Sequence, residues 1–225
     1  FPAAASLAQL DLADNKPAQA RQRFERLLDK DKNNLQAMLA LAELAAADKQ
    51  EATYVDWLEK AAKAHPKAIQ PRAILVRYHL ARNEPQRALA IANEAVAANP
   101  DNPAALDLLG SAQLGAKDKL GAASTFTKLA QEADQSPDAL QRLAYAQLTA
   151  GKQAEAQSAL DKALKLDPGH LASLDTLMRI EMRELSGIPV VSANTDGSVT
   201  YCPRALEPLY RDIIIASVLS NVFAF

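Results

Sequence analysis

Apolar residues recur along the chain at helical spacing, and the pattern repeats every 34 residues without a gap. Counted in segments that begin at Phe1, the seventh position is always leucine: Leu7, Leu41, Leu75, Leu109, Leu143 and Leu177. The eighth position is mostly small: Ala8, Ala42, Val76, Gly110 and Ala144. Small side chains let a neighbouring helix approach closely, so the pattern predicts helices that stack on one another.

Each segment is predicted to hold two helices joined by a short polar turn. Pro17 and Pro85 follow such turns, where the fixed φ of proline suits the first turn of a helix. Other prolines end the second helices, because they cannot continue the hydrogen-bond ladder: Pro66, Pro100 and Pro168. Positions 20 and 27 are expected where the two helices meet, and most of their residues are small, as at Ala20 and Ala61. The predicted units are 1–34, 35–68, 69–102, 103–136 and 137–170, followed by a charged capping helix over 171–185.

These residues resemble the tetratricopeptide repeat family, whose 34-residue unit has small or apolar positions 8, 20 and 27 and a proline at 32. The resemblance covers residues 1 to about 183 and implies an all-α superhelical solenoid with an inner groove.

Two positions depart from the family. Position 4 lacks tryptophan and holds Ala4, Met38, Arg72, Leu106 and Leu140. Position 11 lacks tyrosine and holds Asp11, Ala45, His79, Gln113 and Gln147. We expect the fold to survive both departures, because the leucine and alanine framework is intact.

The resemblance implies that first-helix positions 2, 5, 9, 12 and 13 line the groove and bind a protein or peptide. The candidate groove residues are Gln36, Glu43, Gln70, Arg77, Asp107, Ser111, Asp138, Gln141, Tyr145, Asp175 and Arg179. Arg77 and Tyr145 are the expected anchors, because Arg and Tyr dominate binding hot spots; ordinary solvated residues are the alternative. A carboxylate clamp for acidic chaperone tails is not expected, because Ala5 and Gln9 occupy its positions.

A row of leucines at position 12 has two interpretations. Leu12, Leu80, Leu114 and Leu148 form either an apolar strip for a partner segment or contacts between neighbouring repeats. The second interpretation is favoured, because apolar stripes on helices usually face a core.

Composition and charge argue against several classes of function. The 225 residues carry a formal net charge of −2, which offers no general attraction for nucleic acid. His65, His79 and His170 lack metal-ligand spacing, and no glycine-rich phosphate loop occurs, so we expect no metal and no cofactor. Cys202 is a lone thiol next to Pro203 without an adjacent basic cluster, so it is not expected to act as a nucleophile. The sequence therefore predicts a protein that is not an enzyme.

The segment 186–225 loses the 34-residue period and has few charges. Asp196-Gly197 between β-branched runs favours a short β-hairpin, followed by a helix. The run 213–225 is almost uncharged but shorter than the roughly 20 residues that span a bilayer, so it is either a buried segment or a truncated membrane helix. Residues 210–225 resemble the entry to the first membrane helix of type I secretion ABC transporters.

The alanine-rich runs 39–45, 57–61 and 99–110 resemble the tetratricopeptide lipoproteins of PEP-CTERM/exosortase systems. That resemblance implies an interaction scaffold in bacterial envelope assembly, exopolysaccharide export or protein sorting. It also implies a periplasmic or outer-membrane-associated location with a lipid anchor upstream, the cytoplasm being the alternative.

The chain opens at Phe1 without an initiator Met, which suggests a processed form or a fragment. The alternative functions are a transporter-associated segment whose tail inserts in membrane and a regulatory region of a larger enzyme.

Overall fold

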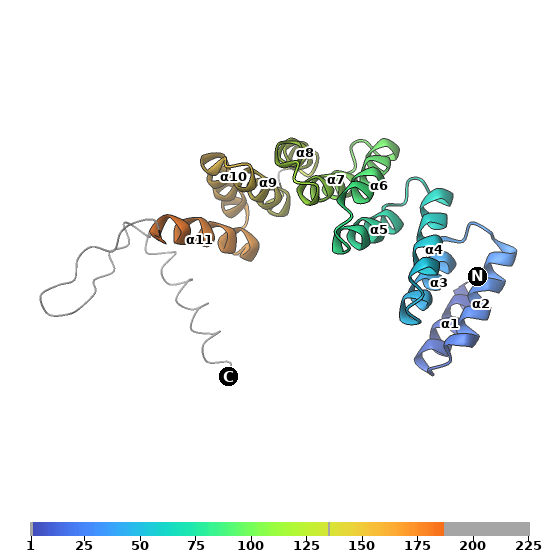
Figure 1. Cartoon of the computed structure of the whole chain (residues 1–225). Helices are drawn as coiled ribbons and strands as arrows, with labels where there is room; N and C mark the ends of the chain where they lie inside the picture. The colour runs from blue at the N-terminus through green and yellow to red at the C-terminus, as the bar shows by residue number, and fades with distance from the viewer. Residues whose placement is uncertain (1, 135, 187–225) are drawn as a thin grey trace, which may run out of the picture. The chain divides into compact units, whose positions relative to one another are not determined.

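A computed structural model of the protein describes residues 2–134 and 136–186, and these residues fold into helices without a strand (Figure 1). The chain divides into two compact units, Phe1–Ile180 and Glu181–Phe225. The predicted hairpin, the apolar run 213–225 and Cys202 lie outside the described residues. No helix among those described is long and apolar enough to cross a membrane.

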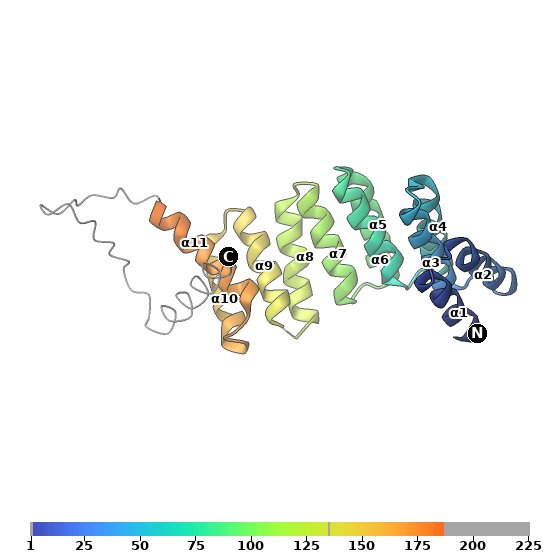
Figure 2. The same cartoon turned by 90° about the horizontal axis from the view of Figure 1, so that it is seen from below.

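The described helices follow one another in pairs (Figures 1 and 2). They are α1 (Pro2–Ala13), α2 (Pro17–Lys30), α3 (Leu35–Ala47), α4 (Glu51–Ala64), α5 (Ile69–Ala81), α6 (Pro85–Ala98), α7 (Pro103–Gly115), α8 (Lys119–Glu132), α9 (Pro137–Thr149), α10 (Gln153–Leu166) and α11 (Leu171–Ser186). Each helix from α1 to α9 packs against the next one, and α5 also packs against α7. The prediction of an all-α solenoid of helix–turn–helix units is confirmed.

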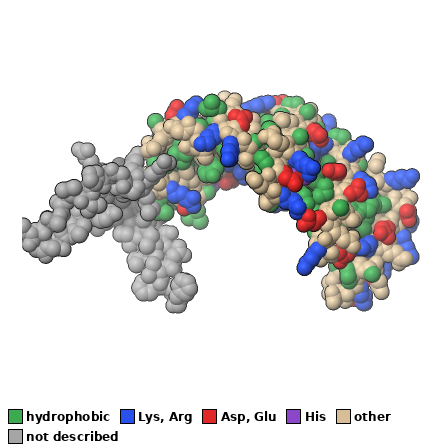
Figure 3. Space-filling view, viewed as in Figure 1, with side chains coloured by type: hydrophobic (Ala, Val, Ile, Leu, Met, Phe, Trp, Pro, Cys, Tyr) green, Lys and Arg blue, Asp and Glu red, His purple; other side chains and the backbone are tan. Residues whose placement is uncertain are grey.

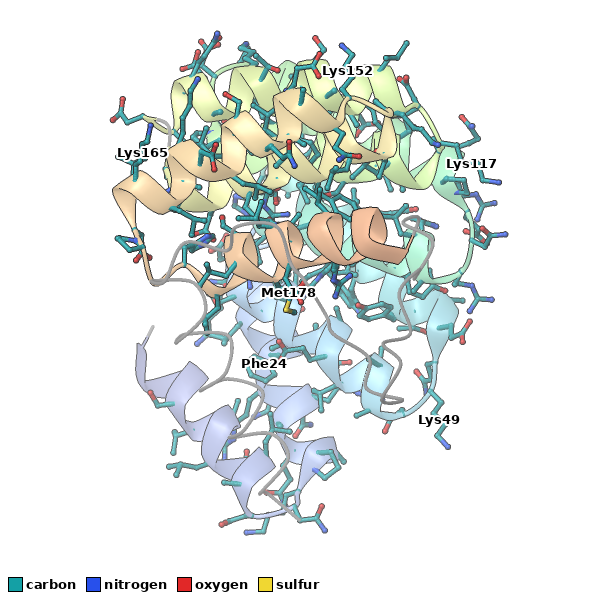
Figure 4. The ribbon with its side chains drawn as sticks, turned by 90° about the vertical axis from the view of Figure 1, so that its left-hand side faces the viewer. Phe24, Lys49, Lys117, Lys152, Lys165 and Met178 are labelled. Atoms are coloured by element: carbon teal, nitrogen blue, oxygen red, sulfur yellow. The ribbon has the colours of Figure 1, made fainter. Side chains whose placement is uncertain are left out.

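The turn inside each unit has a residue in the left-handed backbone region at position 15. These residues are Asn15 (φ 58°), Lys49 (59°), Asn83 (58°), Lys117 (63°) and Gly151 (80°). The N–H of the following residue donates to the carbonyl of position 11, as in Lys16 N to Asp11 O at 2.7 Å and Lys152 N to Gln147 O at 2.8 Å. This bond is the six-to-one bond of a Schellman motif, which satisfies a helix-end carbonyl and reverses the chain. Lys49 and Lys117 point away from the ribbon in Figure 4.

Small residues at positions 8, 20 and 27 form the contacts between helices. Ala8, Ala88 and Ala95 are fully buried. At Gly110 a Cβ would lie only 2.5 Å from Cζ of Phe126 in the paired helix, so only glycine admits that ring. The expected close approach of the helices is therefore observed.

Polar residues at position 11 are buried, as Asp11 and His79 are, or partly buried, and most find a partner in the second helix or turn of the same unit. The pairs are Asp11 with Arg23, His79 with Glu84 (Nδ1 to Oε2, 2.7 Å), and Gln113 with Thr125 (Oε1 to Oγ1, 2.7 Å). Gln147 differs, because its Oε1 is buried without a partner among the described residues. In its unit, alanine (Ala159) occupies the position that Thr125 holds one unit earlier.

Candidate functional site

The predicted groove residues lie on the first helices of the units. Eight of them are exposed: Gln36, Glu43, Gln70, Arg77, Asp138, Tyr145, Asp175 and Arg179. Three are partly buried: Asp107, Ser111 and Gln141. Acidic and basic side chains are interspersed on the face drawn in Figure 3, so local geometry rather than a single-sign field must select a ligand.

A cavity of about 380 Å³ brings three predicted residues together. Ser111 of α7 and Gln141 and Tyr145 of α9 line it, with Leu114 and Phe126 as apolar walls and Arg142 as its one charged lining residue. Tyr145 is half exposed, whereas Phe126 is buried. An apolar hollow with a few converging polar groups is the usual form of a binding site. We refer to it as the α7–α9 cavity.

One polar group of this cavity, the amide of Gln141, is held in place by α11, the first helix after the fifth unit. Gln141 Nε2 donates to Thr176 Oγ1 at 3.2 Å, and the Thr176 hydroxyl donates to the carbonyl of Ala172 at 2.7 Å. Because the hydroxyl hydrogen is used, its oxygen must accept from the Gln141 amide N–H. The amide oxygen of Gln141 therefore remains available as an acceptor.

Arg142, which lines the cavity, forms an ion pair that the sequence analysis does not predict. Arg142 Nε lies 2.9 Å from Asp107 Oδ1, although this oxygen has no well-directed hydrogen bond. Burial raises the pKa of Asp107, and the Arg142 charge opposes that shift. The pair Asp107–Arg142 and the pair Gln141–Thr176 each join position 5 of one unit to position 6 of the next. The sequence carries a signal for both pairs, because their complementary residues lie 35 positions apart.

Glu43 and Arg77 lie near a second group of aromatic side chains. Burial raises the pKa of Tyr54; the Arg77 charge lowers it, and nearby Tyr78 and Glu43 raise it. The rings of Tyr54 and Tyr78 meet edge to face, with centroids 5.6 Å apart. Arg77 is thus close enough to Tyr54 to act on its pKa, and it does not line the α7–α9 cavity.

The remaining predicted residues do not join either group. Asp138 Oδ1 lies 3.1 Å from His170 Nε2. Asp175 Oδ2 forms an ion pair with Arg179 Nε, 2.9 Å away and one helical turn along α11. Among the described residues, Gln36 and Gln70 make no side-chain hydrogen bond.

The leucines at position 12 mostly pack into the repeat core. Leu80, Leu114 and Leu148 are partly buried against core clusters, whereas Leu12 is 39% exposed. The interpretation as contacts between repeats is confirmed for these three, and no continuous apolar strip results.

The histidines lie at separate places, each with its own partner. His65 contacts the carbonyl of Asn33, His79 pairs with Glu84, and His170 contacts Ser173. The hydrogen bond with His79 lowers the pKa of Glu84. Within residues 2–134 and 136–186 no group of three or more His, Cys, Asp and Glu side chains has the arrangement of a metal site.

The model of the tetratricopeptide repeat matches residues 6–69 and 75–139, which is more than half of the chain. The chain belongs to the tetratricopeptide repeat family. A search of the curated proteins finds no match.

Solved tetratricopeptide structures share the fold at low sequence identity. YrrB, described as a tetratricopeptide protein with an unusual peptide-binding site, is 19% identical, with a TM-score of 0.58 over 78% of this chain and 90% of its own. The part of MamA from residue 41 onward, from Desulfovibrio magneticus, is 18% identical, with a TM-score of 0.58 over 76% and 96%. A thermophilic tetratricopeptide protein of Thermus thermophilus is 18% identical, with a TM-score of 0.55 over 82% and 98%.

Proposed function

We propose that this tetratricopeptide protein is a non-catalytic interaction scaffold that binds an extended peptide segment of a partner protein at the α7–α9 cavity. The observation that carries the proposal is the convergence of Ser111, Gln141 and Tyr145 around one hollow on the first helices. The peptide-binding site of YrrB, a structural relative, supports a peptide as the class of ligand.

The chemistry of the cavity suits a peptide backbone flanked by an apolar side chain. The free amide oxygen of Gln141 accepts a backbone N–H, and the Ser111 hydroxyl can donate to a backbone carbonyl. The Tyr145 ring offers a rigid apolar surface with a polar end, a combination that costs little entropy on binding. Asp107 balances the charge of Arg142, so the site has no strong preference for a charged ligand.

We also propose that the scaffold acts in the bacterial envelope, in protein sorting or exopolysaccharide export, with a periplasmic or outer-membrane-associated location. The support for this setting is the resemblance of the alanine-rich runs to lipoproteins of such systems. The setting and the peptide site are independent, and either can fail without the other.

Capture of proteins on the immobilised chain tests both proposals. Envelope and cytosolic fractions of the source cell are passed over the wild type, the Tyr145→Ala variant and a Leu120→Ala control, whose side chain is 66% exposed on α8. We expect specific proteins from the envelope fraction that are lost with Tyr145→Ala and kept with the control. Equal retention by all three chains would contradict the peptide site; partners only from the cytosol would contradict the envelope setting.

A further inference from the structure

Two crevices at equivalent places open between the second helices of neighbouring units. The first, of about 580 Å³, is lined by Leu28, Asp29, Lys32, Asn33, Met38, Trp57, Lys60, Lys63 and Ala64. The second, of about 490 Å³, is lined by Glu59, Ala62, Lys63, Pro66, Arg72, Leu75, Ile91 and Glu94. Most lining residues correspond at an offset of 34, for example Met38 to Arg72 and Trp57 to Ile91. The two crevices are therefore the same site of the repeat with different chemistry.

The second crevice holds a buried cation with internal partners. Arg72 is 6% exposed, and its Nη1 donates to the carbonyl of Pro66 at 2.9 Å. Glu94 lies 3.9 Å from the same guanidinium. A carbonyl and a carboxylate thus hold this guanidinium, although its Nε has no partner among the described residues. Lys63 lines this crevice as well, but beside Glu59 and Glu94, whose carboxylates oppose an acidic ligand.

The first crevice has an apolar interior and basic groups without partners. Trp57 and Met38 form its walls, and Lys60 lies over the Trp57 ring, 4.7 Å from the centroid, while pairing with Asp56 at 2.7 Å. Lys32 and Lys63 have no acidic partner among the described residues. Lys32 stands where three other units have proline, so this cation is particular to the first crevice.

Between the third and fourth units, a lysine of the second helix bonds to the preceding turn instead of leaving a crevice open. Lys128 occupies the same repeat position as Lys60. Its ammonium donates to the carbonyl of Pro100 at 3.0 Å and to Asp101 at 2.9 Å, both in the turn of the preceding unit. Lys60 instead turns to Asp56 and Trp57, so it does not bridge the first crevice.

We propose that the first crevice binds an acidic peptide segment of a partner protein. An apolar side chain of that segment lies against Trp57 and Met38, and flanking carboxylates pair with Lys32 and Lys63. Asp29 is the one carboxylate that lines the crevice, and it opposes an acidic ligand. This surface is built from α2, the turn after it, Met38 of α3 and α4, and it shares no residue with the α7–α9 cavity.

Trp57 is the only tryptophan of the chain, so its fluorescence reports on this crevice directly. The probe is a blocked pentapeptide with a central leucine flanked by acidic residues, and its counterpart has lysines in their place. We expect the acidic peptide to change the Trp57 emission in a saturable way and the basic peptide to leave it unchanged. The Lys32→Gln/Lys63→Gln variant should weaken binding roughly fivefold, the effect of losing two partly exposed ion pairs.

Lys165→Gln is the matched control, because Lys165 holds the position of Lys63 in the fifth unit and is exposed (Figure 4). It should leave the affinity unchanged, and Asp29→Asn should tighten it. The proposal is overturned if no emission change occurs up to about 1 mM peptide, the weak end of specific binding. Equal binding of the basic peptide, equal loss with Lys165→Gln, or tighter binding of a single-stranded oligonucleotide than of the acidic peptide would also overturn it. Variants at Tyr145 do not touch this site, so failure here and failure of the α7–α9 cavity are distinguishable.

Discussion

Single residues at position 15 set the backbone of every turn within a unit. Asn and Gly adopt the left-handed region readily, but Lys49 and Lys117 have a Cβ that crowds the backbone there. The left-handed conformation therefore costs more free energy in the turns at Lys49 and Lys117 than in the turns at Asn15, Asn83 and Gly151.

Replacing Lys49 with glycine should raise the free energy of unfolding by about 0.5–1 kcal/mol, because the strain at φ 59° is relieved. Urea unfolding followed by circular dichroism measures the change. Lys152→Gly is the control, since it removes the same side chain at φ −95°, where lysine is unstrained. An equal or larger gain with Lys152→Gly would show that charge, not backbone conformation, is responsible.

The two glutamines at position 11 are predicted to respond in opposite directions to replacement by leucine. Gln147→Leu removes a buried oxygen without a partner and should leave stability unchanged or raise it by up to about 1 kcal/mol. Gln113→Leu leaves the Thr125 hydroxyl without its acceptor and should cost about 1–2 kcal/mol. Thermal unfolding of the two variants beside the wild type tests the difference, and equal effects would argue against it.

Ionisation of Asp107 should lower the stability of the folded protein in a pH-dependent way. Its pKa is raised by burial, so the ionised form is disfavoured in the folded state. Below the ordinary carboxyl pKa, Asp107 is protonated in both the folded and the unfolded chain, and its ionisation costs nothing. Above the raised pKa of the folded state it is ionised in both, and the full destabilisation is present. The stability of the protein therefore falls as pH rises between these two pKa values. Asp107→Asn should therefore raise the unfolding temperature at about pH 7 and have no such effect near pH 3. A gain that is the same at both pH values would contradict this explanation.

At the scale of helices, the 34-residue period was enough to predict which segments form helices and where turns lie. First helices α3, α5, α7, α9 and α11 begin at residues 35, 69, 103, 137 and 171, which are the predicted unit starts. The period was sufficient because each unit repeats the same small and apolar contact positions, and those positions alone determine how helices stack.

The period could not show which side chains meet across units. Contacts between first helices follow an offset of 35, which is why Arg142 and Thr176 were missed. Arg72 was noted only as a departure from tryptophan, whereas the structure shows a buried guanidinium held by a carbonyl. Such partners depend on side-chain direction and local burial, which a positional consensus does not contain.

The contact between α7 and α8 is predicted to tolerate nothing larger than glycine at position 110. Gly110→Ala places a methyl group against the buried Phe126 ring, and the overpacking cost of about 1–3 kcal/mol should exceed the helix-propensity gain of about 1 kcal/mol. Adding Phe126→Leu to Gly110→Ala should recover part of the loss, because the smaller side chain makes room. Urea unfolding of the single and double variants measures this coupling, and strictly additive effects would contradict it.

At the scale of the whole molecule, the described helices present two separate surfaces with different chemistry. The α7–α9 cavity is formed mainly by first helices and is close to neutral, whereas the first crevice lies between second helices and is basic with an apolar interior. A scaffold with two independent sites can hold two segments of one partner or two partners, and linking them raises avidity beyond either affinity.

The most direct test of the α7–α9 cavity as a binding site is the affinity of peptides selected on the wild-type chain from a random library without acidic residues, measured by calorimetry. Leaving out acidic residues excludes the ligands proposed for the first crevice. The account predicts one-to-one binding that Tyr145→Ala weakens at least tenfold, the loss of about 1.4 kcal/mol expected for a hot-spot tyrosine, and that Leu120→Ala leaves unchanged. Peptides that bind the wild type and Tyr145→Ala equally well would contradict the central claim that the α7–α9 cavity is the binding site.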